Sequence, residues 1–117
     1  MNMGPVTLPN HFVTIEDVNE IGDTSPEVAI TKATQLIRGG FQVDAVWCDP
    51  KAGTVIISPT GNYHFKTATC GYDNDAARAA AVIIEIAGFS NFVHAYQELS
   101  WGGDDSRSYF DHQQRAR

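Results

Sequence analysis

The apolar positions between Ser25 and Gly40 recur with the period of a helix. Ser25 is a good N-cap, Pro26 suits the first helical position, and Glu27 places an acid in the first turn. The apolar residues fall at i, i+4, i+7 and i+8 and therefore share one face: Ala29, Ala33, Leu36 and Ile37. Gly39 and Gly40 predict the end of this helix.

Three segments that favour strands follow, at 41–48, 54–58 and 63–70, and the first of them alternates residue by residue between two sides. Turn-forming residues separate them, at 49–53 and 59–62. The pattern predicts a three-stranded antiparallel meander. Its register stays open, because the sequence does not determine the turn types.

A second helix is predicted from Asn74 to Ala87, with Asp73 as N-cap after Gly71 breaks the strand and with Gly88 at the end. This helix is apolar nearly all round, and such a helix is buried on most sides. We expect the C-terminal segment or a second subunit to cover it. A homodimer or a higher homo-oligomer is therefore a hypothesis.

The two ends of the chain carry weaker patterns. Residues 90–101 fit a third helix capped by Ser90, and a strand over 93–101 is an open alternative. Residues 1–10 look irregular, and 11–15 form a short run that favours a strand.

Length and composition suit one globular domain. The chain has 117 residues, 43% of them hydrophobic and 19% charged. We predict the α+β class: one small domain over residues 1–101, in the order helix, meander, helix and C-terminal helix, followed by a polar tail over 102–117 that is disordered or docked on a partner. No apolar run approaches the roughly 20 residues of a membrane helix, and the N-terminus lacks a signal-peptide pattern. We therefore expect no membrane association and a cytoplasmic location.

The two cysteines, Cys48 and Cys70, are expected on the first and third strands of the meander. Two strand spacings, roughly 9 to 10 Å, would separate them. A disulfide needs Cα atoms within about 7 Å, so two reduced structural thiols are predicted.

Negative charge is concentrated in one short stretch. The net charge is −6, and the segment from Glu16 to Glu27 holds five acids and no base. One interpretation is a docking surface that steers a basic protein partner, and the other is a solvated loop with a helix start. The acids that precede the helix are the candidates for partner binding: Glu16, Asp17, Glu20 and Asp23. Nucleic-acid binding is not expected, because it depends on basic side chains that neutralise phosphates.

The segment 25–88 carries a helix, three strands and a helix, with small residues at the last strand-to-helix junction: Gly71, Ala76, Ala80 and Ala81. In these features it resembles the double-stranded RNA-binding domain over about half of the chain. The resemblance implies the topology alone. Asp73, Asn74 and Ala77 stand where that family has phosphate-binding lysines.

The junction between the third strand and the second helix is also a candidate site for a small anion such as a nucleotide. Backbone N–H groups at a helix start attract anions. The candidate ligand-binding residues are Gly71, Tyr72, Asp73, Arg78 and His64. The chain lacks the glycine-rich motifs that hold phosphates, and no cofactor is predicted.

No pattern predicts catalytic residues or a metal site. The four histidines lack metal-ligand spacing, and Ile21 and Val28 stand where a calcium loop needs oxygen ligands. His64 and Cys70, on one predicted strand, would lie roughly 20 Å apart, too far for a nucleophile and its base. A small enzyme that uses His64 or a cysteine is the weakest hypothesis.

Three large aromatic residues lie in the polar C-terminal stretch, where exposure is costly: Trp101, Tyr109 and Phe110. We expect them to dock on the domain or on a partner. With the acidic stretch they favour a non-enzymatic interaction protein, such as an accessory protein or host-defence inhibitor of a phage or mobile element. The alternative is an oligomeric protein that binds a small anionic ligand at the strand-to-helix junction.

Overall fold

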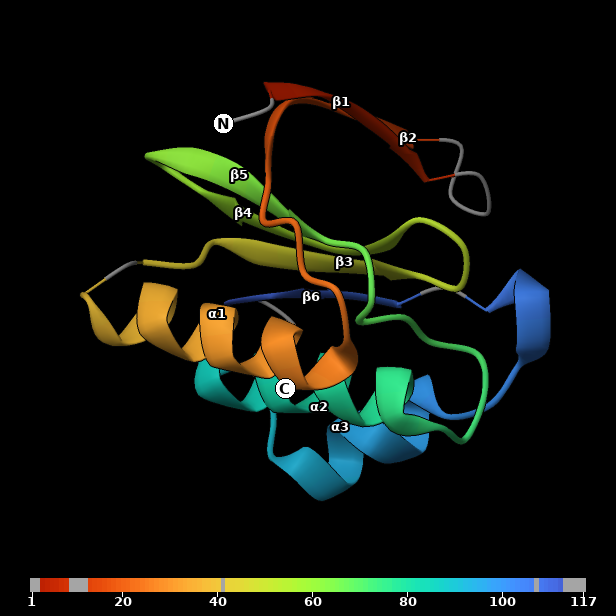
Figure 1. The fold of residues 1–117 in the computed structure, drawn as a ribbon. Coiled ribbons are helices and arrows are strands. Elements are labelled where there is room, and N and C mark those ends of the chain that lie inside the picture. Colours follow the sequence, from red (N-terminus) through yellow and green to blue (C-terminus); the bar gives the residue numbers. More distant parts are fainter. Residues whose placement is uncertain (1–2, 9–12, 41, 107, 113–117) are drawn as a thin grey trace.

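All three α-helices of the described chain lie on one face of a single sheet (Figure 1). The computed structural model describes residues 3–8, 13–40, 42–106 and 108–112. The strands are β1 (Met3–Leu8), β2 (Val13–Glu20), β3 (Ala45–Asp49), β4 (Gly53–Ser58), β5 (Gly61–Phe65) and β6 (Ser108–Asp111). The helices are α1 (Pro26–Arg38), α2 (Asp75–Ile86) and α3 (Phe92–Leu99), with a short 3-10 helix, η1 (Gly103–Asp105). None of these helices is long and apolar enough to cross a bilayer.

The strands form one mixed sheet in the order β1-β2-β5-β4-β3-β6. Only β2 and β5 run parallel, and every other neighbouring pair is antiparallel. The predicted α+β class is confirmed, but the sheet has six strands, whereas the sequence predicted a three-stranded meander and one short strand at 11–15. Both edge strands were missed: residues 3–8, expected to be irregular, form β1, and residues 108–111, expected in a free tail, form β6.

The predicted strand boundaries were wrong for β2, β3 and β5. β2 continues to Glu20, five residues beyond the predicted end. β3 covers residues 45–49, and β5 ends at Phe65, five residues before the predicted end. The N–H groups that follow, those of Lys66 and Thr67, donate to the carboxylate of Asp23 at 3.1 and 2.8 Å. A side chain thus satisfies the backbone groups that a neighbouring strand would otherwise bond, and the chain leaves the sheet.

The helices follow the sequence pattern, with small shifts at their caps. α1 begins at its predicted cap, Ser25. Asn74 rather than Asp73 caps α2, and Asn91 rather than Ser90 caps α3. The alternative of a strand in place of α3 is wrong.

α2 packs against both other helices and against the sheet of its own chain (Figure 1). Arg78 and Glu85 are exposed on one side, and the buried residues cover more than half of the circumference: Ala77, Ala79, Ala80, Ala81, Ile83 and Ile84. The chain itself therefore covers the apolar surface that motivated an oligomer. A homo-oligomer stays a prediction, now without that support.

The two faces of the sheet carry separate cores. The helix-covered face holds the larger core, which includes Phe65 and Phe110. On the opposite face, residues of the β1–β2 hairpin pack with β4 in a smaller core: Val6, Ile15, Val18 and Val55. Alternate residues of a strand point to opposite faces, so Cys48 of β3 faces the helices and His64 of β5 lies on the other side.

Candidate docking surface

Asp23, one of the four predicted partner-binding acids, is a structural residue. It is fully buried, and its carboxylate accepts hydrogen bonds from the N–H of Lys66 and from both the N–H and the hydroxyl of Thr67. These bonds fasten the segment before α1 to the end of β5. The prediction that Asp23 lies on an exposed surface was wrong, because a charged run need not be solvated along its whole length.

Glu20 is also engaged within the chain. Its carboxylate lies 2.8 Å from Nδ1 of His64, across the parallel pairing of β2 and β5. Nε2 of the same ring bonds the carbonyl of Ala52. His64 therefore links β2, β5 and the turn before β4. It does not join Gly71 and Tyr72 in one site as the sequence predicted.

Glu16 and Asp17 are the two predicted acids that remain on the surface. Both side chains are exposed, and they lie on β2 rather than in the expected loop. Asp17 adopts a left-handed backbone conformation, with φ 55°. The acidic face inferred from four residues thus reduces to this pair.

The junction between β5 and α2 offers no free N–H at Gly71. That N–H donates to the carbonyl of Leu99 at 2.7 Å, and the Gly71 carbonyl accepts from Gly103 at 2.8 Å. Gly71 has a φ of 103°, and a Cβ there would stand 2.5 Å from the Gly103 oxygen, so only glycine fits. The segment after α3 is thereby tied to the junction.

Arg78 is held by neighbours on and beside α2. Its Nη1 lies 3.1 Å from a carboxylate oxygen of Asp75, and its guanidinium carbon lies 5.8 Å from the ring centre of Tyr96. A pocket of about 230 Å³ between the starts of α1 and α2 is lined by Arg78 and also by Glu27 and Asp75. Two carboxylates beside one guanidinium disfavour the anionic ligand that the sequence suggested.

Trp101 and Tyr72 are strongly exposed aromatic residues, with 70% and 49% of their surface accessible. They lie on two segments that the hydrogen bonds of Gly71 hold together. After Trp101 the chain turns sharply through two left-handed glycines, Gly102 at φ 104° and Gly103 at φ 68°. Tyrosine and tryptophan are enriched at protein interfaces, because each combines a large apolar ring with a polar group.

Carboxylates accompany these aromatic rings. The Tyr72 hydroxyl donates to Asp104 at 2.8 Å, and the Tyr96 hydroxyl donates to Asp73. Asp73, Asp104 and Asp105 are all exposed. The hydrogen bond to Asp104, more than the partial burial and the neighbouring charges, raises the pKa of Tyr72. We call this group the aromatic–acidic surface: Tyr72, Asp73, Tyr96, Trp101, Asp104 and Asp105.

The other two aromatic residues of the predicted tail lie elsewhere. Phe110 is only 6% exposed and belongs to the main core. Tyr109 packs on Trp47, with ring centres 4.4 Å apart, where β6 pairs with β3. Of the two predicted alternatives, docking on the domain or on a partner, Phe110 follows the first, because β6 carries it under the helices. Trp101 alone of the three is freely accessible.

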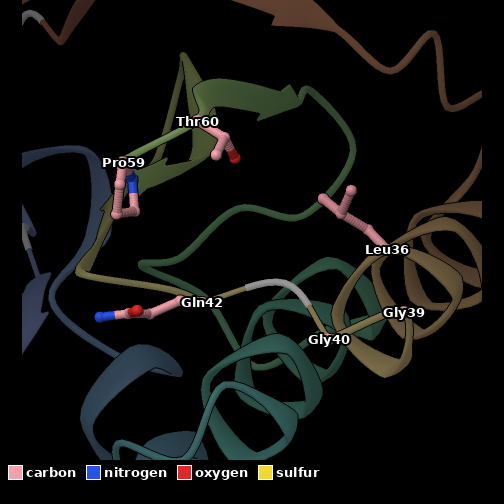
Figure 2. Close-up of a pocket in the computed structure, with 6 residues that line it drawn as sticks. All are labelled: Leu36, Gly39, Gly40, Gln42, Pro59 and Thr60. Carbon is pink, nitrogen blue, oxygen red and sulfur yellow. The ribbon is translucent and has the colours of Figure 1, made fainter.

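A larger pocket lies between the end of α1 and the β4–β5 turn (Figure 2). Its volume is about 510 Å³. Figure 2 shows the residues that line it: Leu36, Gly39, Gly40, Gln42, Pro59 and Thr60. None of these residues is ionisable, so the described part of the lining offers no charged group for recognition of an ion.

His64 lies away from both thiols. The Cys48 and Cys70 thiols lie on the helix side of the sheet, and His64 lies on the other. No group of three or more His, Cys, Asp or Glu side chains in the described ranges is placed to hold a metal.

Comparisons of the chain with protein-family models, curated proteins and solved structures gave no match. What the protein binds must therefore be inferred from its own side chains. The sequence pattern did not single out Asp104 and Asp105, because the tail carries no net charge. Their place directly after Trp101 and two glycines is the signal that would have found them.

Proposed function

We propose that this protein binds a basic protein partner through the aromatic–acidic surface and acts by occupying that partner. The observation that carries the proposal is the exposed indole of Trp101, just before η1 in the chain, where the Asp104 carboxylate accepts a hydrogen bond from the exposed Tyr72. An accessory or inhibitor protein of a phage or mobile element is the kind of protein that works in this way.

Aromatic and acidic side chains together recognise cationic groups. A partner arginine or lysine placed over Trp101 or Tyr72 gains about 0.5 to 2 kcal/mol from the ring quadrupole. Asp104 and Asp105 can accept its charge-assisted hydrogen bonds. Tryptophan and tyrosine are also enriched among the residues that dominate binding energy. The net charge of −6 adds attraction at long range.

The proposal is tested first with a synthetic peptide of alternating lysine and arginine, about ten residues long, at about 0.15 M salt. The peptide is titrated into isotope-labelled protein, and the two indole N–H signals are followed by NMR. The signal of Trp101 should move, while that of Trp47, packed on Tyr109, should stay.

Matched variants separate this surface from the overall charge. Trp101→Ala, and Asp104→Asn combined with Asp105→Asn, should each weaken binding about tenfold or more. The control, Glu16→Gln with Asp17→Asn, removes the same charge from β2, and asparagine tolerates the left-handed backbone at position 17. If both double variants lose affinity equally, the peptide is attracted by net charge alone and the proposal fails.

A further inference from the structure

Both ring nitrogens of His64 face hydrogen-bond acceptors. Nδ1 lies 2.8 Å from both carboxylate oxygens of Glu20 on β2, and Nε2 bonds the backbone carbonyl of Ala52 in the turn between β3 and β4. A carbonyl oxygen accepts and cannot donate, so Nε2 carries a proton. A carboxylate also only accepts, so the contact at Nδ1 requires a second proton. A neutral imidazole carries one ring proton, and the two bonds together therefore need the imidazolium form.

The two bonds of His64 respond differently to loss of a proton. The bond from Nε2 to Ala52 persists in the neutral ring, because the remaining proton can stay on Nε2. The contact at Nδ1 is lost, because the Nδ1 lone pair would then face the Glu20 carboxylate at hydrogen-bond distance and the two would repel. The side chain of Glu20 is 36% exposed and can turn toward water, whereas the ring is 12% exposed and keeps its place.

We propose that Glu20 and His64 form a pH-sensitive link, which fastens the end of β2 to β5 while the imidazole is protonated and opens when Nδ1 loses its proton. Among side chains, histidine is the one that ordinarily changes charge between about pH 5 and about pH 8. Opening of the link releases a proton, so a rise in pH favours the open form. The proposal does not depend on the docking function, which uses neither of these two residues.

The link lies at the end of a short strand pairing. β2 and β5 pair over residues 18–20 and 62–64. Directly after this pairing, the N–H of Ile21 donates to the carbonyl of His64 at 3.1 Å. One residue, His64, thus holds β2 through its side chain and the following residue through its backbone. The backbone bond of Ile21 should therefore report the opening of the side-chain link.

The other charged groups of the elements around the ring do not replace Glu20. β4, which pairs with β5 at His64, carries no ionisable side chain. The two buried carboxylates of the adjoining segments, Asp23 and Asp49, each accept two backbone N–H groups. The remaining charged side chains of these segments are exposed, so that solvent screens them: Glu16, Asp17, Lys51 and Lys66.

The test follows the isotope-labelled full chain by NMR from about pH 5 to about pH 8. The ring ¹⁵N signals of His64 should show protons on both nitrogens at the acidic end and on Nε2 alone at the basic end. Over the same range, the protection of the Ile21 N–H against hydrogen exchange, corrected for the intrinsic effect of pH, should fall about fivefold. The N–H of Asp44, which bonds the Ile57 carbonyl at 2.8 Å, should keep its protection. A neutral ring with its proton on Nδ1, or equal protection of Ile21 in both forms of His64, overturns the proposal.

Variants of Glu20 test its part in the link. In Glu20→Gln the side-chain amide can accept from a protonated Nδ1 or donate to a bare one, so the pH dependence of Ile21 exchange should disappear while His64 still titrates. Glu20→Ala removes the link in both forms, so the protection of Ile21 should be equally low at both ends of the range. His94→Gln is the matched control, because His94 is exposed on α3 and its titration should not affect Ile21. Either Glu20 variant that keeps the pH dependence of the wild type refutes the link.

Discussion

The carboxylate of Asp23 bonds both the backbone N–H and the hydroxyl of Thr67, which lies 44 residues further along the chain. With the added bond from the Lys66 N–H, one buried acid holds the end of β5 against the segment that leads into α1. These donors take the place of water around the buried carboxylate, so that its oxygens keep their hydrogen bonds.

Replacement of Asp23 by alanine should lower the free energy of unfolding by about 3 kcal/mol, because two backbone N–H groups lose their acceptor in a buried place. Urea denaturation monitored by circular dichroism measures the change. Glu16→Ala, an exposed acid of the same stretch, should change stability by less than about 0.5 kcal/mol. Equal effects of the two replacements would mean that the Asp23 bonds contribute nothing.

The contrast between Asp23 and Glu16 could not be predicted from the sequence. Both belong to one acidic run, and a distant segment, Lys66 and Thr67, decides which of them is buried. Local signals were far more informative. The cap at Ser25 was placed correctly, because a helix cap depends on residues within one turn of itself.

Strand pairing explains the remaining errors in the same physical terms. The pattern at residues 108–111 is too short to predict a strand, and its pairing with β3 depends on residues far away in the sequence. Phe110 and Trp101 looked alike as aromatic residues in a polar tail, yet one entered the core.

Among the glycines near the aromatic–acidic surface, Gly71 should tolerate replacement by alanine least. Alanine there combines a left-handed backbone, costing about 1 to 2 kcal/mol, with a Cβ that lies 2.5 Å from the Gly103 oxygen. We expect a total loss of about 3 kcal/mol or more and a displaced Trp101. Gly22→Ala is the control, because it shares the left-handed conformation but has nothing within 4 Å. Thermal unfolding measures the effect. An equal decrease in the melting temperature of both variants would show that the contact with Gly103 is easily relieved.

The phenol of Tyr72 should ionise at higher pH than an ordinary tyrosine, because its hydroxyl donates to Asp104 and the phenolate cannot. The pKa of Tyr72 is raised in the folded protein. The protonated phenol therefore stabilises the fold below its ordinary pKa of about 10, and this stabilisation is lost as the pH rises through the raised pKa. Asp104→Asn should move this titration down in pH. Ultraviolet absorbance of the phenolate measures it, with Tyr72→Phe to assign the signal.

Tyr109 provides the internal control for that titration. Its pKa is raised chiefly by burial, with Asp111 adding to the effect, and not by Asp104. Its titration should therefore be the same in the wild type and in Asp104→Asn. A shift of both phenols together would point to a general change of the fold instead of a lost hydrogen bond.

Trp101 and Phe110 should respond to alanine in opposite ways. Phe110→Ala leaves a cavity in the main core and should cost about 3 to 5 kcal/mol of stability. Trp101→Ala removes a side chain that is 70% exposed and should cost less than about 0.5 kcal/mol. Binding of the basic peptide should weaken only in Trp101→Ala, because Phe110 does not belong to the aromatic–acidic surface. Urea denaturation and titration with the basic peptide are made on both proteins. If Trp101→Ala is strongly destabilised, the indole stabilises the fold and is not a binding residue.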